Sequence, residues 1–111
     1  MMATVDVSGC LINHTVASNI LFYKSGTSTY EKATTDSQGN FTVALEAGTT
    51  YTPIKVRRYD PPSWVPCCGP DYVDVPSGVG THNMGNVNGC GYYVKLEAPP
   101  EEEEADLPEQ G

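Results

Sequence analysis

The sequence of 111 residues has few basic residues: six Lys and Arg stand against 14 Asp and Glu, and the formal net charge is -8. Because no basic stripe is present to neutralise phosphates, we expect no nucleic-acid partner. The sequence also lacks any apolar run near the ~18 residues that span a bilayer, so we expect no membrane insertion. Protein surfaces and glycans are left as the classes of partner to consider.

A secretory signal is missing as well. The first residues, Met1-Met2-Ala3-Thr4-Val5-Asp6, lack the basic start and the apolar core of such a signal. For a complete chain, this predicts no export by the usual secretory route. We expect the protein in a virus or phage particle, at an extracellular surface if a signal has been removed, or in the cytoplasm if its cysteines are reduced.

Acidic residues are unevenly distributed along the chain. Six of the 14 lie in the last eleven residues, where no base occurs, while residues 1–100 carry eight acids against six bases. From Ala98 onward Pro and Glu dominate, which predicts a disordered acidic tail over 98–111. A functional version of this tail would dock onto a basic surface of a neighbouring subunit and become ordered only when bound. The six acids are Glu101, Glu102, Glu103, Glu104, Asp106 and Glu109.

Short strands and many turns are indicated by 11 Gly and 9 Pro together with abundant Thr, Val and Tyr. Residues 4–8 alternate polar and apolar, which places Val5 and Val7 on one face of a half-buried strand. Seven or eight such strands, separated by closely spaced turns, predict an all-β Greek-key β-sandwich over residues 1–97. We predict strands at 4–8, 19–23, 29–34, 41–45, 51–56, 72–75, 82–87 and 92–96.

Two turns carry the clearest local signals. In residues 35–41, Asp36 can bind the backbone ahead of it and Gly39 can take a positive φ, which predicts a tight hairpin turn. Residues 46–50 predict a second turn into the strand that begins at Tyr51. A Tyr in this place is expected to pack its ring on the core and to hydrogen-bond the backbone through its hydroxyl.

Three stretches, 35–41 (TDSQGNF), 45–51 (LEAGTTY) and 83–87 (NMGNV), resemble the carboxypeptidase regulatory-like domain, a prealbumin- or transthyretin-like sandwich related to Cna-B domains. The resemblance covers Val5 to about Leu96 and implies architecture, not activity. The Tyr-Arg-Gly-Ser end of the related hydroxyisourate hydrolases is missing. The first-strand Lys of Cna-B cross-links is missing too, although Lys24 lies on the inward parity. We therefore expect no enzyme.

Motifs for a nucleophile or a metal are also missing. His14 and His82 stand alone, and no G-x-S-x-G motif presents a serine for attack. Cysteines and His82 are ligand types that zinc prefers, but no two cysteines have the two- to four-residue spacing of structural zinc sites. We predict no catalytic residue, no cofactor and no metal site. A metal- or thiol-dependent function of the four cysteines stays as a second alternative.

Four cysteines in a chain of this size suggest a disulfide framework. Three connectivities are open: 10–90 with 67–68, 10–67 with 68–90, and 10–68 with 67–90. The adjacent pair weakens this interpretation because a bridge between neighbours forces a strained ring, and reduced buried thiols are the alternative. The candidate disulfide residues are Cys10, Cys67, Cys68 and Cys90.

Four prolines in residues 57–71 preclude a central strand and predict a long loop or an edge excursion. Aromatic and Arg side chains cluster around this Pro- and Cys-rich insertion. Recognition surfaces use such side chains because they bury a large area at low entropy cost. A second interpretation is that Trp64 closes one end of the sandwich over its own core. The candidate partner-binding residues are Arg57, Arg58, Tyr59, Trp64 and Tyr72.

These observations predict a non-enzymatic structural or accessory module of a larger assembly, such as a decoration or tail component of a phage or virus particle, or a surface fibre. The expected partners are further copies of the chain, in a homo-oligomer, or capsid, tail or fibre subunits, because uncovered edge strands favour assembly. The alternative is an adhesion module that binds a carbohydrate or a protein through the aromatic loop.

Overall fold

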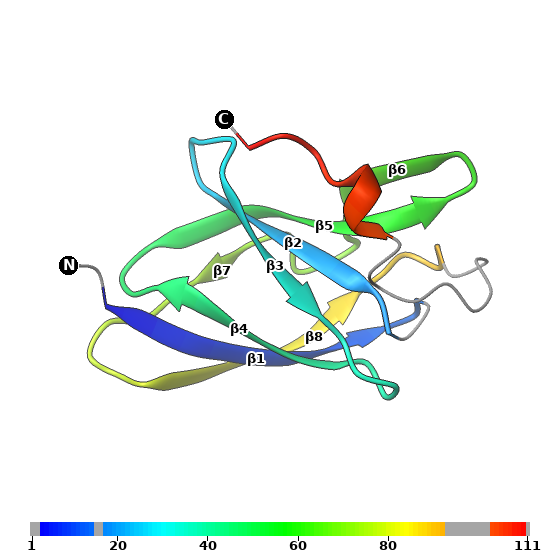
Figure 1. The fold of residues 1–111 in the computed structure, drawn as a ribbon. Coiled ribbons are helices and arrows are strands. Elements are labelled where there is room, and N and C mark those ends of the chain that lie inside the picture. The colour runs from blue at the N-terminus through cyan, green and yellow to red at the C-terminus, as the bar shows by residue number, and fades with distance from the viewer. Residues whose placement is uncertain (1–2, 15–16, 93–102, 111) are drawn as a thin grey trace.

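A computed structural model describes residues 3–14, 17–92 and 103–110. Two sheets pack face to face, as Figure 1 shows, and the predicted all-β sandwich is confirmed. The first sheet has the order β4-β1-β8; the second has the order β3-β2-β5-β6, with β7 also paired to β5. The strands are β1 (Thr4–Ile12), β2 (Asn19–Lys24), β3 (Tyr30–Thr34), β4 (Asn40–Glu46), β5 (Thr50–Tyr59), β6 (Pro62–Pro66), β7 (Val73–Asp74) and β8 (Thr81–Asn88).

The core lies between the sheets and follows the two-residue periodicity of the strands. Val5 and Val7 of β1 are fully buried, while Thr4 and Asp6 between them are exposed. Inward side chains of both sheets fill the interior: Val5, Val7, Leu11, Ile20, Phe22, Ala33, Phe41, Val43, Leu45, Tyr51, Ile54, Val56, Cys67, Val73, Val75 and Val87.

The first sheet pairs strands that are far apart in the sequence. Strand β1 pairs antiparallel with β4 and parallel with β8, with Asp6 opposite Thr81 and Ile12 opposite Asn88. The register of the parallel pair shifts between Ser8 and Gly9. The predicted last strand over 92–96 falls, after Tyr92, outside the described residues, and Tyr92 itself packs against the core.

The Pro-rich insertion forms an edge strand, the second of the two predicted alternatives. Strand β5 continues to Tyr59, and β6 returns beside it with Arg57 opposite Trp64. Pro62 and Pro66 occupy the two ends of β6. An outermost strand tolerates proline because the side without an N–H group needs no partner strand.

The hairpin turn at residues 35–41 is confirmed in atomic detail. Asp36 Oδ1 accepts hydrogen bonds from the backbone N–H groups of Gln38, at 2.8 Å, and Asn40, at 3.0 Å. Gly39 has φ +87°, and a side chain there would meet the carbonyl oxygen of Leu11 at 2.5 Å. The turn therefore needs glycine both for its backbone conformation and for the approach of β1.

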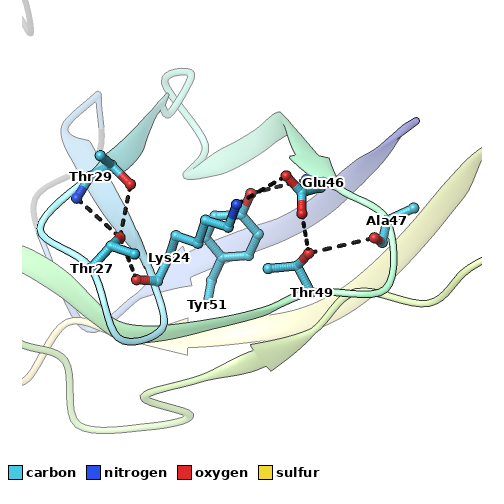
Figure 2. Close-up of polar contacts among 7 residues, drawn as sticks. All are labelled: Lys24, Thr27, Thr29, Glu46, Ala47, Thr49 and Tyr51. Carbon is cyan, nitrogen blue, oxygen red and sulfur yellow. Dashed lines mark hydrogen bonds and ion pairs between the residues drawn. The ribbon is translucent and has the colours of Figure 1, made fainter. Parts of the chain in front are cut away.

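Tyr51 also behaves as predicted. Its ring is buried, and its hydroxyl accepts a hydrogen bond from the backbone N–H of Glu46 at 3.0 Å. Figure 2 shows Lys24 and Thr49 converging on the same glutamate: Lys24 Nζ lies 3.1 Å from Oε1, and Thr49 Oγ1 donates to Oε2 at 2.7 Å. Lys24 comes from β2 of the second sheet and Glu46 from the end of β4 of the first, so this group ties the two sheets together.

The cysteines form one bridge instead of the two-bridge framework. Cys68 and Cys90 are joined, as in the connectivity 10–67 with 68–90, but Cys10 and Cys67 are free. Cys10 lies on β1 in the first sheet, whereas the buried Cys67 follows β6 and its Sγ–H donates to the Pro70 carbonyl at 3.0 Å. Burial raises the pKa of the Cys67 thiol. Bridge and buried thiol therefore both occur.

We predict that Gly39→Ala destabilises the fold more than Gly26→Ala. Both glycines have positive φ, but nothing lies within 4 Å of a side chain at position 26. The left-handed conformation alone costs alanine about 1–2 kcal/mol, so the clash with Leu11 adds to that cost only at position 39. Urea unfolding of both variants measures the difference, and equal losses would contradict the assigned role of the contact.

A second prediction concerns acid unfolding. Hydrogen bonds from Thr49 and Lys24 lower the pKa of Glu46 in the folded chain. A carboxyl with a lowered folded-state pKa stabilises the fold above its unfolded value, and that contribution is lost as pH falls through the folded pKa. The difference in unfolding free energy between wild type and Glu46→Gln should therefore shrink from neutral pH to about pH 3. Urea unfolding across this range tests it, with Glu31→Gln as the control for the loss of an exposed carboxylate.

Candidate functional site

The outer face of the second sheet is covered, although it points away from the core. In β2, Ile20 and Phe22 face the interior, yet Leu21 and Tyr23 on the opposite side are also buried. The cover is a C-terminal segment, residues 103–110, which includes the short helix η1 (Glu104–Asp106). We call residues 103–110 the tail segment. The outer face comprises Asn19, Leu21, Tyr23, Tyr30, Lys32, Lys55, Arg57, Tyr59 and Trp64.

The predicted disordered tail is therefore wrong for residues 103–110; residues 98–102 and 111 lie outside the described part. Figure 1 shows the red C-terminal segment lying against β5 and β6. Composition alone predicts that neighbouring carboxylates repel each other and keep such a segment solvated. The outer face overcomes this repulsion because it supplies cations and hydrogen-bond donors to the individual acids.

Arg57 is the central contact. Its side chain is only 4% exposed, and Nη2 lies 2.8 Å from Asp106 Oδ2 of the tail segment. The guanidinium carbon lies 5.4 Å from the centre of the Trp64 ring, which suits a cation–π contact. Trp64 Nε1 in turn donates to the backbone carbonyl of Asp106 at 3.1 Å. One arginine and one tryptophan thus bind both the side chain and the backbone of the same tail residue.

Glu103 enters the face more deeply. It is 1% exposed, and one carboxylate oxygen accepts from both the backbone and side-chain nitrogens of Asn19, each at 3.3 Å. The other oxygen accepts a hydrogen bond from the Tyr59 hydroxyl. Burial, and secondarily the contact with Glu103, raises the pKa of Tyr59. Tyr59 therefore stays protonated and acts as a donor throughout the neutral range.

An apolar contact anchors the middle of the tail segment. Leu107 packs against the cluster of Leu21, Tyr23 and Tyr30, with Trp64 at its side. The two tyrosine rings lie 5.3 Å apart at a tilted angle. The cluster lies outside the main core, so without Leu107 it would expose an apolar patch to water.

Further polar contacts follow the segment in both directions. Lys32 Nζ pairs with the carboxylate of Glu104. The Tyr30 hydroxyl donates to the Pro108 carbonyl at 2.9 Å, and the Tyr30 N–H donates to Gln110 Oε1 at 3.4 Å. Contacts therefore extend over eight residues, from Glu103 to Gln110.

Charge is complementary across this contact. The chain has six basic residues, and three of them, Lys32, Lys55 and Arg57, belong to the outer face. The tail segment carries four acids and no base. Two of the three bases pair directly with tail carboxylates, whereas Lys55 lies over the Tyr23 ring at 5.0 Å. This arrangement suits binding of an extended acidic peptide with one apolar anchor.

Of the five predicted partner-binding residues, the structure brings three together. Arg57, Tyr59 and Trp64 meet at the tail segment, as described above. Arg58 instead donates through Nε to the Pro61 carbonyl at 3.2 Å, and Tyr72 is 51% exposed before β7. Trp64, which is partly buried, contacts Arg57 through its ring and the tail segment through Nε1.

The sequence interpretation missed the part of the face contributed by β2 and β3. These residues are Asn19, Leu21, Tyr23, Tyr30 and Lys32. One signal was available, because β2 is apolar on both of its faces, which is typical of a strand covered on two sides. Nothing in the spacing of the residues indicated which segment supplies the second cover.

The described residues hold no group of three or more His, Cys, Asp or Glu side chains placed to bind a metal ion. In the same part of the chain, no helix has the length and apolar character to cross a bilayer. A shallow hollow of about 330 Å³ lies on the first sheet, lined by neutral side chains such as Asn40, Asn83 and Asn86.

Comparisons with protein-family models, with curated proteins and with solved structures found no match to this chain. The resemblance to the carboxypeptidase regulatory-like domain therefore stays a prediction from three sequence stretches. The sandwich and the outer face stand on the geometry of this chain alone.

Trp64 is the only tryptophan, so its fluorescence reports on the tail segment. We predict that Leu107→Ala shifts the emission to longer wavelength and increases quenching by acrylamide, because loss of the apolar anchor exposes the indole ring. The exposed Glu109→Gln in the same segment is the control and should leave the spectrum unchanged. An unchanged spectrum for Leu107→Ala would contradict the anchoring role of the leucine.

Proposed function

We propose that this protein is a non-enzymatic accessory module that joins a larger assembly by binding an extended acidic segment on its outer face. A virus or phage particle or a surface fibre is the kind of assembly that the module would serve. The observation that supports this proposal most directly is Arg57, buried to 4% exposure and paired with Asp106 beside Trp64. Buried Arg and Trp side chains are enriched among the interface residues that contribute most to the free energy of binding.

The chemistry of the face defines its ligand. Trp64 and Tyr30 donate to backbone carbonyls, so the ligand must run along the face with its main chain accessible. Arg57 and Lys32 require carboxylates in the ligand. The aromatic cluster requires one apolar side chain, which in the tail segment follows the carboxylates and precedes the proline. The tail segment meets these requirements with the sequence EEADLPEQ.

The face also has unused binding capacity. Among the described residues, Arg57 Nε has no hydrogen-bond partner although it is buried. A guanidinium can bind a carboxylate through two parallel N–H groups, but here Asp106 engages only Nη2. A ligand that places its carboxylate across Nε and Nη2 would therefore gain one charge-assisted hydrogen bond over the tail segment.

The test is direct binding of a fluorescein-labelled peptide with the sequence of residues 103–110. The receptor is the full chain with Asp106→Asn and Leu107→Ala, which weaken its own tail segment and leave the outer face intact. We expect saturable binding by fluorescence anisotropy. The wild-type chain should bind more weakly, because its own tail segment competes at a high effective concentration.

A matched peptide with Asp106→Asn is the control. Hydrogen bonds to charged groups contribute about 1.5–3 kcal/mol, so this peptide should bind about tenfold or more weakly. Raising the salt concentration should weaken the native peptide further, since the exposed part of the contact is screened. Equal binding of the two peptides, or no binding of either, would overturn the proposed function.

A further inference from the structure

We propose that the tail segment of one copy binds the outer face of a second copy, so that two chains exchange their tail segments in a closed dimer. This inference rests on the proposed function and names the partner of the same face. Its basis is the length of chain before the tail segment, the charge of the two parts, and the fact that each copy carries one segment and one face.

The chain is long enough for exchange. Ten residues, 93–102, separate Tyr92 from Glu103. At up to about 3.6 Å per residue, they can extend to roughly 40 Å. The molecule measures 40 × 29 × 22 Å along its principal axes. The tail segment can therefore reach the outer face of an adjacent copy as well as that of its own chain.

The distribution of charge favours the same partner. The last eleven residues carry six acids and no base, whereas the rest of the chain has eight acids and six bases and is nearly neutral. Two such bodies repel each other weakly, and each offers the cationic outer face that the tail segment of the other requires. A second copy thus supplies ligand and receptor in equal number.

Exchange also has a natural symmetry. When the segment of the first copy lies on the second and the reverse contact forms too, the two contacts are related by a two-fold axis, and the dimer leaves no face unfilled. Every contact described for the tail segment is kept, because only the chain that donates it changes. Concentration then decides the outcome: dilute chains fill their own faces, and chains gathered in an assembly fill those of their neighbours.

The test mixes two full-length variants that cannot close on themselves. The face variant carries Arg57→Ala and keeps a native tail segment; the tail variant carries Asp106→Asn with Leu107→Ala and keeps a native face. Each alone should sediment as a monomer, because it lacks either a native face or a native tail segment. The protein concentration is about 0.3 mM, which approaches the millimolar effective concentration of a short flexible linker. An equimolar mixture should double in mass, because the native segment of the first fits the native face of the second.

The outcomes separate this inference from the proposed function. If the mixture stays monomeric while the labelled peptide binds the tail variant, exchange between copies is refuted and peptide binding by the face stands. If the peptide does not bind either, both proposals fail. Complex formation that is lost when the face variant also receives Leu107→Ala supports exchange, because that change removes the only native segment in the mixture.

A milder face variant guards against misfolding. If Arg57→Ala fails to unfold cooperatively in urea, Lys32→Glu with Trp64→Phe replaces it, because these changes reverse one charge and remove the indole N–H while keeping an aromatic ring. The mixture with the tail variant should again double in mass. A monomeric mixture with this folded pair refutes exchange in the same way.

Discussion

An arginine side chain leaves water only where other groups neutralise it and satisfy its donors. Arg57, at 4% exposure on the outer face of the second sheet, is neutralised because Asp106 lies 2.8 Å away and Trp64 lies over the guanidinium. Its donors are satisfied only in part, since Nε has no partner among the described residues. Removal of the Asp106 carboxylate would leave the buried charge of Arg57 uncompensated, which is far more costly than loss of a surface pair. This contact fixes the tail segment at Asp106, between the buried Glu103 and the apolar anchor Leu107.

The second sheet becomes the middle of three layers as a result. Its inner side packs on the first sheet through Ile20 and Phe22, and its outer side packs on the tail segment through Leu21 and Tyr23. A contact that mixes apolar packing with ion pairs is less self-sufficient than the purely apolar core. We expect this contact, unlike the core, to respond to salt and to competing acidic ligands. We therefore expect ligands to exchange on the outer face while the core beneath it stays packed.

Local sequence signals predicted the fold well. Contacts between residues far apart in the sequence could not be predicted in this way. Asp36 and Tyr51 act through backbone groups within five residues, and the sequence indicates each of these contacts. The tail segment depends on Arg57, Lys32 and Asn19, which lie between 49 and 84 residues away in the chain. Composition shows that Glu103 and Asp106 are charged but not which groups compensate them. The choice of bridge is limited in the same way. Cys67 and Cys68 lie at almost the same separation from Cys90 in the sequence, and only the three-dimensional structure shows that Cys68 forms the disulfide while Cys67 is buried as a free thiol.

The parallel pairing of β1 with β8 also has a consequence for biosynthesis. As the ribosome releases the chain from its N-terminus, β2 and β3 can pair soon after they emerge, because only residues 25–29 link them. The middle strand of the first sheet, by contrast, has one neighbour at residues 40–46 and the other only at residues 81–88. Until that last strand is translated, one edge of β1 stays open, and nascent chains on the same messenger have an interval in which they can capture each other.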